Sequence, residues 1–186
     1  RLPRFIFDLI WDRFLEMASN VEIKARANAR ARQLRLARLM RGKEIRLRQE
    51  DTFFRCPSGR LKLREFSRGP AQLIFYRRAN QAGPKVSRYQ IARVDSPAKL
   101  KALLAGALGK AGVVRKKRTV FLVGQSRIHF DDVERLGRFI EIEVVLKPRQ
   151  TPAQGRGIAH ELMARLTIKK ADLLKTAYAD LLCTAK

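Results

Sequence analysis

The chain has few acidic residues for its length. Among its 186 residues, 17 are aspartate or glutamate and 41 are lysine or arginine, which leaves a formal net charge of +24 at pH 7. This shortage of acidic charge indicates an anionic partner, whether a nucleic acid, an acidic membrane surface or phosphate groups. The hydrophobic fraction of 46% is ordinary for a globular protein and argues against a disordered chain.

Cysteine is also scarce. The two cysteines, Cys56 and Cys183, are far apart and show neither metal-ligand spacing nor a C-x-x-C motif. This pattern argues against a disulfide scaffold and favours a reducing compartment inside the cell. We therefore expect a cytoplasmic protein.

The sequence lacks an uninterrupted apolar run long enough to cross a membrane. Its most apolar segment, residues 1–16, is interrupted by Asp8 and Asp12, and so it predicts neither a signal peptide nor a transmembrane helix. Met17 begins a stretch that is typical of a natural start. We expect residues 1–16 to be an extension, either additional translated sequence or an amphipathic appendage, and we expect no membrane partner.

Residues 17–186 contain no linker, low-complexity tract or internal repeat, and they are predicted to form one α+β domain. Helices are predicted over residues 28–41, from Ser96 onward, and twice near the carboxyl end. Strands are predicted near residues 20–27, 44–54, 60–67, 71–79, 85–94, 112–123, 125–133 and 139–147. The last helix is expected to cover the outside of the sheet with an apolar stripe of Leu173, Leu174, Ala177, Tyr178, Leu181 and Leu182.

A charged alternation recurs on several of these strands. The alternating residues are Glu22, Lys24 and Arg26; Lys62 and Arg64; Lys116 and Arg118; Arg127, His129 and Asp131; and Glu141 and Glu143. Successive side chains of a strand point to opposite faces, so each charged set shares one face. An ordinary explanation is a solvated outer face over an apolar core. The grouping of cations on some strands and acids on others favours a closed sheet whose charged face points inward, a basic tunnel suited to a polyphosphate with a divalent metal.

Seven short segments also occur in an order that is typical of one protein family. They are Asn20–Arg26, Gln49–Phe54, Arg60–Arg64, Gly83–Lys85, Val113–Arg118, Gly124–Asp131 and Phe139–Glu143. Together they resemble the CYTH domain, the fold shared by class IV adenylate cyclases, thiamine triphosphatases and other triphosphate tunnel metalloenzymes. The resemblance covers about residues 20–182, and the pattern is most similar to the cyclase-like branch found in animals.

The resemblance implies an eight-stranded antiparallel β tunnel, closed or nearly closed and flanked by helices, that binds a triphosphate with Mg²⁺ or Mn²⁺. Arginine and lysine suit phosphate oxygens, whereas hard divalent cations take carboxylate ligands. By position in the family pattern, the phosphate-binding residues would be Lys24, Arg26, Lys62, Arg64, Arg78, Lys85, Lys116, Arg118 and Arg127. Lys24, Arg64 and Arg118 would also be catalytic. The metal ligands would be Glu22, Asp131, Glu141 and Glu143. His129 is expected to line the tunnel or pack within it rather than to bind metal.

Asn20 departs from the family pattern. It stands where the opening motif has its first glutamate, so a neutral carbonyl oxygen replaces a carboxylate and one ligand charge is lost. The departure bears on how many metal ions the site holds and on whether the full activity is retained.

The leading functional prediction is a metal-dependent triphosphatase acting on ATP, thiamine triphosphate or tripolyphosphate. One alternative is cyclisation of a nucleotide with release of pyrophosphate, as in an adenylate cyclase. The other is a noncatalytic module that binds polyphosphate or nucleic acid. The arginines at positions 30, 35, 38 and 41 lie on a predicted helix and are expected to add only weak, nonspecific nucleic-acid binding. A homodimer is a further expectation.

Overall fold

The computed structural model describes residues 18–184, which form eight strands and four α-helices. The predicted extension over residues 1–16 lies outside the described residues. The strands are β1 (Ala18–Arg26), β2 (Lys43–Phe54), β3 (Arg60–Phe66), β4 (Ala71–Arg78), β5 (Lys85–Val94), β6 (Lys110–Val123), β7 (Ser126–Val133) and β8 (Gly137–Val145). The helices are α2 (Arg30–Leu39), α3 (Pro97–Leu108), α4 (Pro152–Arg165) and α5 (Tyr178–Thr184), with a 3₁₀ turn at Lys170–Asp172.

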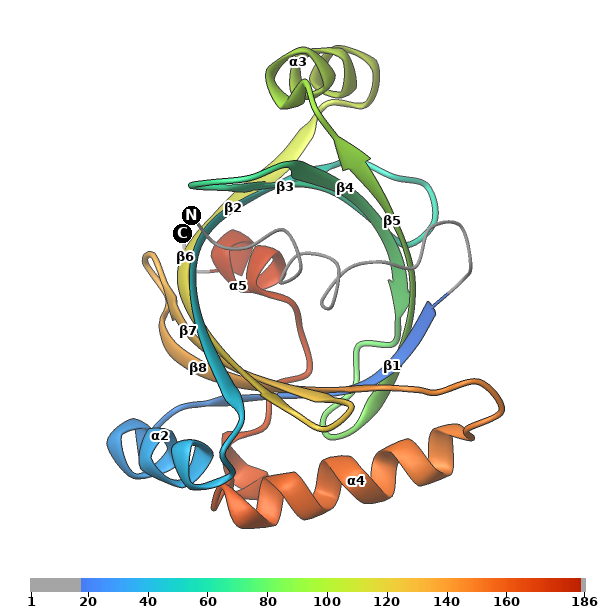
Figure 1. The fold of residues 1–186 in the computed structure, drawn as a ribbon. Coiled ribbons are helices and arrows are strands. Elements are labelled where there is room, and N and C mark those ends of the chain that lie inside the picture. The colour runs from blue at the N-terminus through green and yellow to red at the C-terminus, as the bar shows by residue number, and fades with distance from the viewer. Residues whose placement is uncertain (1–17, 185–186) are drawn as a thin grey trace.

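The eight strands close into one antiparallel barrel. Their order around the barrel is β1-β5-β4-β3-β2-β6-β7-β8, and β8 pairs with β1 to complete the ring (Figure 1). Full closure pairs both edges of the sheet, so no strand edge is left as a template for aggregation. The prediction of an α+β fold built on a closed antiparallel tunnel is confirmed.

The register of the strands separates charged from apolar side chains. Between β1 and β8, Lys24 is opposite Glu141, whereas the neighbouring residue Ile23 is opposite Ile142. The isoleucines are almost fully buried in the outer layer between the sheet and the helices. The charged residues point into the barrel, where they line its cavity. Alternation with a period of two therefore builds an apolar layer outside the barrel wall and a polar layer inside it.

Helix α4 covers the outer faces of β1 and β8 (Figure 1). Its start is defined by a capping box: the Thr151 side chain accepts a hydrogen bond from the Gln154 backbone N–H, while the Gln154 side chain accepts one from Thr151 N–H. The helix buries Gly155, Ala159 and Leu162 against the sheet. The small residue at position 155 lets the backbone of α4 approach β1 closely.

The last helix differs from the prediction. It begins at Tyr178, and Leu173 instead pairs with Ala25 as an isolated β-bridge, so the predicted single apolar stripe is wrong. In the view along the barrel, α5 lies within the ring of strands (Figure 1), and it packs with inward-facing Phe53 and Phe139. The expectation that this helix covers the outside of the barrel is therefore also wrong. Apolar side chains point inward at this end of the barrel, and α5 removes them from water.

The helices over residues 18–184 are short or polar. No helix in this range is both long and apolar enough to cross a membrane.

Two glycines of α4 provide a matched test of its packing on the sheet. A Cβ at Gly155 would lie 2.5 Å from Leu146 Cδ2 and 2.8 Å from Val21 Cγ2, whereas a Cβ at Gly157 would meet nothing within 4 Å. Gly155→Ala should therefore lower the free energy of unfolding by about 1–3 kcal/mol through overpacking. Gly157→Ala should raise it by up to about 1 kcal/mol through helix propensity. Chemical denaturation of both variants measures the difference; equal effects would contradict close packing of α4 on β1.

Candidate functional site

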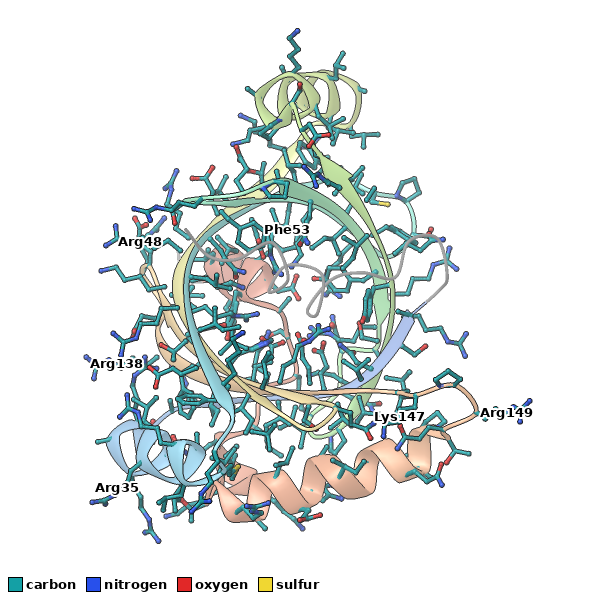
Figure 2. The ribbon with its side chains drawn as sticks, viewed as in Figure 1. Arg35, Arg48, Phe53, Arg138, Lys147 and Arg149 are labelled. Atoms are coloured by element: carbon teal, nitrogen blue, oxygen red, sulfur yellow. The ribbon has the colours of Figure 1, made fainter. Side chains whose placement is uncertain are left out.

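A single cavity in the barrel interior collects the charged strand residues. Its lining includes seven cationic side chains and four carboxylates, an excess of three positive charges. The cations are Lys24, Lys62, Arg64, Arg78, Lys116, Arg118 and Arg127, and the carboxylates are Glu22, Asp51, Glu141 and Glu143. Figure 2 shows Phe53, which also lines the cavity, pointing into the ring, whereas Arg48 and Arg138 point away from it.

Asp51 organises the cationic side of the cavity. Arg64 donates two hydrogen bonds to it, from Nε to Oδ1 at 2.7 Å and from Nη2 to Oδ2 at 2.8 Å. Lys62 Nζ donates to the same carboxylate at 2.9 Å, and Lys116 Nζ lies 3.6 Å from it. Burial of Asp51 opposes ionisation, but the positive charges of Arg64, Lys62 and Lys116 hold its pKa well below the usual value. The carboxylate therefore stays ionised and orients three cations.

Two lysines on this side have lowered pKa values. Burial, together with the charge of Arg118, lowers the pKa of Lys116 to about 7. Burial and the charge of Arg64 lower the pKa of Lys62 to about 8. Both ammonium groups therefore lose protons close to neutral pH in the unliganded protein.

Asp131 on β7 orients Arg118 in the same way that Asp51 orients Arg64. It accepts two hydrogen bonds from Arg118, both at 2.6 Å, and one from the Tyr178 hydroxyl at 3.0 Å. Its side chain is fully buried behind Arg118, and it is not among the residues that line the cavity. Burial opposes ionisation, but Arg118 keeps the pKa of Asp131 below its usual value. The assignment of Asp131 as a metal ligand stays a prediction, because the observed contacts of its carboxylate are with Arg118 and Tyr178.

The remaining carboxylates gather on β1 and β8. Glu141 lies 3.5 Å from Lys24 Nζ and 2.9 Å from Arg118 Nη2, and Glu143 lies 3.6 Å from Arg127 Nη1. Glu22 pairs with Arg78. Burial of Glu22 and the negative charge of Glu141 raise its pKa despite this pairing. Glu22, Glu141 and Glu143 thus lie on β1 and β8, whereas Lys62, Arg64, Lys116 and Arg118 lie on β3 and β6, with Asp51 of β2 between them.

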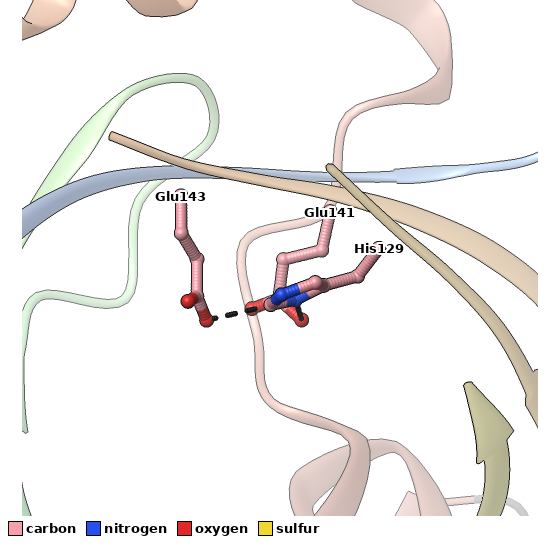
Figure 3. Close-up of side chains that lie close together, drawn as sticks. All are labelled: His129, Glu141 and Glu143. Atoms are coloured by element: carbon pink, nitrogen blue, oxygen red, sulfur yellow. Dashed lines mark ion pairs between the residues drawn. The ribbon is translucent and has the colours of Figure 1, made fainter. Parts of the chain in front are cut away.

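The imidazole of His129 lies close to both glutamates of β8 (Figure 3). Its Nδ1 is 3.9 Å from Glu141 Oε2 and 3.8 Å from Glu143 Oε1, beyond hydrogen-bond distance. One ligand atom from each of the three residues lies within 4.8 Å of the others. His129 Nδ1 is buried and has no hydrogen-bond partner among the described residues. Burial and the charge of Arg118 lower the pKa of the imidazole, which leaves a neutral ring. An unpartnered nitrogen beside two carboxylate oxygens fits a divalent cation.

Two of the nine predicted phosphate-binding residues do not line this cavity. Arg26 is exposed at the end of β1, with its guanidinium 5.6 Å from the centre of the Phe139 ring. Lys85 is buried, and its Nζ donates to the carbonyl oxygens of Gln81 and Leu174, both at 3.0 Å. The observed contact of Lys85 holds the C-terminal segment against β5. The other seven predicted residues line the cavity together, and their phosphate-binding roles stay predictions.

Asn20 also faces the interior. It is 5% exposed and lines the cavity, and its Oδ1 is buried without a hydrogen-bond partner among the described residues. The departure from the family pattern therefore lies inside the candidate site, on the strand that also carries Glu22.

Sequence reasoning missed two residues that position this site. Asp51 belongs to the segment Gln49–Phe54 and shares the inward parity of Phe53, so the alternation could have revealed it. No comparable pattern in the sequence indicated that Tyr178 contacts the site. It reaches Asp131 only because the chain after α4 returns to the end of the barrel, where Leu174 N–H donates to Lys24 O at 2.8 Å.

A closed antiparallel barrel whose interior cavity is lined by charged side chains defines a tunnel-type fold. The model of the CYTH domain family matches residues 18–178, and the chain therefore belongs to the CYTH domain family. The resemblance inferred from the seven sequence segments is confirmed.

Solved structures with the same fold come from several different organisms. The PH1012 protein from Pyrococcus horikoshii OT3 has a TM-score of 0.78 and 23% identity, with 87% of this chain and 98% of that chain covered. A proposed adenylate cyclase from Vibrio parahaemolyticus has a TM-score of 0.73 and 18% identity, covering 90% and 99%. HpAC1 from Hippeastrum has a TM-score of 0.63 and 16% identity, covering 91% and 97%. At these identities the likeness establishes the fold alone. No curated protein sequence matches the chain.

The lowered pKa of Lys116 leads to a test by pH. A bound triphosphate favours the charged ammonium, so binding should take up a proton where the free pKa is about 7. Between pH 6.5 and 8.5, the affinity of the wild-type protein for tripolyphosphate should fall about tenfold relative to that of Lys116→Arg, whose guanidinium stays charged. Calorimetry in two buffers of different ionisation enthalpy measures the affinity and the protons taken up. Parallel pH profiles for the two proteins would contradict a titrating Lys116.

Proposed function

We propose that the protein is a metal-dependent triphosphatase that binds its substrate in the barrel and hydrolyses the terminal phosphate. The observation that carries this proposal is the cavity lining of seven cations and four carboxylates, with three of the carboxylates on the neighbouring strands β1 and β8. The cationic side chains suit phosphate oxygens, and the carboxylates on β1 and β8 would suit a divalent cation that accompanies the phosphates. ATP, thiamine triphosphate and tripolyphosphate are the proposed substrate class.

Arg64 and Arg118 are the proposed principal phosphate ligands. Each is held from behind by a buried aspartate through Nε and Nη2, which leaves Nη1 outside the bidentate pair. Fixed guanidinium groups need no reorganisation as charge shifts toward the leaving phosphate, and this preorganisation favours the transition state. Lys24, between Glu141 and the Tyr178 ring, is the proposed third catalytic cation.

Glu141 and Glu143 are the residues proposed to hold Mg²⁺ or Mn²⁺. Contrary to the expectation from the sequence, His129 is proposed as a third ligand because its Nδ1 has no partner among the described residues, and its nitrogen suits Mn²⁺ better than Mg²⁺. Glu22 and Asn20 lie on the neighbouring strand and complete this side of the cavity. When bound, the ion supplies positive charge that neutralises the phosphate oxygens. The raised pKa of Glu22 means that metal binding at this side competes with a proton and strengthens as pH rises.

Cyclisation of a nucleotide is the second candidate within the same site. It would use almost all of the same residues, with the α-phosphorus rather than the γ-phosphorus facing the nucleophile. Hydrolysis is favoured by analogy with HpAC1, a protein of this fold with a dominant triphosphatase activity. Product identification with ATP separates the two: hydrolysis releases phosphate, whereas cyclisation releases pyrophosphate. Binding of triphosphate without any metal-dependent turnover would instead favour a noncatalytic module.

Glu143→Gln tests the metal site. The substitution keeps the shape of the side chain and removes its charge, so metal-dependent turnover of tripolyphosphate should fall by roughly 10²–10³. Binding of tripolyphosphate without metal should hold or tighten, because a negative charge near the phosphates is removed. Phosphate release and calorimetry measure the two effects.

Arg64→Ala is the matched comparison for Glu143→Gln. It should weaken binding of tripolyphosphate without metal, the opposite of the effect at Glu143. Full turnover by Glu143→Gln alongside an active wild type would place the metal elsewhere.

Asn20→Glu tests the departure from the family pattern. A carboxylate at this buried position should tighten Mn²⁺ binding by about tenfold, since it adds one charged oxygen ligand. Asn20→Gln has the same length without the charge and should leave the affinity within about twofold. Mn²⁺ titration followed by electron paramagnetic resonance measures free metal directly. Equal affinities for the two variants would show that position 20 lies outside the metal site.

A further inference from the structure

The side chain of Tyr178 contacts two different parts of the molecule. Its ring packs with Phe53 and Phe139 at one end of the barrel, with its centre 4.9 Å from the centre of the Phe139 ring. Its hydroxyl extends beyond this apolar cluster and donates a hydrogen bond of 3.0 Å to Asp131. A residue that only fills the core at this place needs the ring alone, so the contact of the hydroxyl has a separate explanation.

The hydroxyl completes the hydrogen bonding of a fully buried carboxylate. Among the described residues, the hydrogen-bond donors to Asp131 are Arg118, which binds both oxygens at 2.6 Å, and Tyr178, which binds Oδ2. Burial and the negative charge of Asp131 raise the pKa of Tyr178 well above its usual value, so the hydroxyl keeps its proton and stays a donor. Because a buried carboxylate lacks water as a partner, each protein donor restricts its rotation.

The barrel in turn holds the chain around Tyr178. Arg60 Nη2 on β3 donates to Asp180 Oδ2 at 2.8 Å, and the same oxygen accepts a hydrogen bond from Ala177 N–H at 3.0 Å. These contacts tie the first turn of α5 to the wall of the barrel. The Tyr178 hydroxyl is therefore a fixed donor against which the carboxylate of Asp131 is oriented.

Asp51 provides a comparison within the same barrel. It holds Arg64 through two hydrogen bonds of 2.7 and 2.8 Å, and it accepts a further one from Lys62 at 2.9 Å. Each buried aspartate that holds an arginine thus has one additional donor, which is a lysine at Asp51 and the tyrosine at Asp131. The repeated arrangement indicates that the additional donor orients the pair.

We propose that Tyr178 is a positioning residue, whose hydroxyl holds Asp131 so that Asp131 holds Arg118 in the orientation that meets phosphate. The catalytic consequence rests on the proposed triphosphatase function, whereas the orientation of Arg118 is a property of the unliganded protein. A guanidinium that is oriented in advance needs no reorganisation as charge shifts toward the leaving phosphate. Loss of the hydroxyl therefore slows turnover more than it weakens binding.

Tyr178→Phe removes the hydroxyl and keeps the ring. With tripolyphosphate and Mn²⁺, kcat should fall about tenfold, less than the roughly 10²–10³ expected for a group that contacts the phosphate directly, while KM stays within about twofold. In the background of Asp131→Asn, the same substitution should change kcat less than about twofold, because the hydroxyl acts through the carboxylate. Equal losses of kcat in the two backgrounds, or an unchanged kcat in Tyr178→Phe, would overturn the positioning role in catalysis.

Nuclear magnetic resonance of the unliganded protein tests the orientation of Arg118 without turnover. Its Nε–H donates to Asp131 and should exchange with water about fivefold faster in Tyr178→Phe than in the wild type. Arg64 is the internal control, because its Nε–H donates to Asp51 in the same bidentate geometry and should keep its exchange rate within about twofold. The loss of each signal in Arg118→Lys and Arg64→Lys identifies it.

The exchange rates separate the positioning role from the proposed function. Faster exchange at Arg118 alone would support the role of Tyr178 even if the wild-type protein hydrolysed no triphosphate, a result that would overturn the triphosphatase instead. Equal acceleration at Arg118 and Arg64 would show a general loosening of the barrel and would overturn the positioning role. An unchanged exchange rate at Arg118 would overturn it as well.

Discussion

Burial of positive charge inside the barrel is the constraint on which the rest of the structure depends. Removing a cation from water costs several kcal/mol unless a carboxylate pairs with it, and the cavity lining includes seven cations. Asp51 and Asp131 offset much of this cost, because each binds an arginine through two hydrogen bonds. The compensation is incomplete: burial, together with the charges of Arg118 and Arg64, lowers the pKa of Lys116 to about 7 and that of Lys62 to about 8. A bound polyanion, as proposed above, would balance the remaining positive charge.

One end of the barrel, next to these charges, is sealed by apolar residues. Phe53, Val114 and Phe139 face inward there and are covered by α5, whose Tyr178 hydroxyl reaches Asp131. The Tyr178 ring also lies 4.0 Å from Lys24 Nζ. The aromatic ring limits access of water to the ion pairs, and a lower local dielectric strengthens them. The C-terminal segment therefore belongs to the site as well as to the core.

Much of the candidate site could be predicted because the alternation of side chains between the two faces of a strand is a local property. Lys62 and Arg64 share a face in any β-strand, and closure of the sheet then brings them opposite Glu141 and Glu143. Near the end of a strand, this alternation does not predict which side chains line the cavity. Arg26 has the parity of Lys24, yet it lies beyond the cavity at the last residue of β1. Lys85 has inward parity as well, but the returning C-terminal segment occupies its ammonium group.

The sequence by itself determined the strands, their inward charged faces and the family, because hydrophobic alternation and the order of the motifs are properties of consecutive residues. Only the tertiary structure decided which charges meet. The cross-strand register and the closure of the barrel place Asp51 and Asp131 beside arginines. They also place His129 close to two glutamates. The tertiary structure also decided that α5 closes one end of the barrel, because burial of the inward-facing aromatic rings at that end depends on residues more than a hundred positions apart in the chain, such as Phe53 and Tyr178. Long-range contacts of this kind leave no period in the sequence.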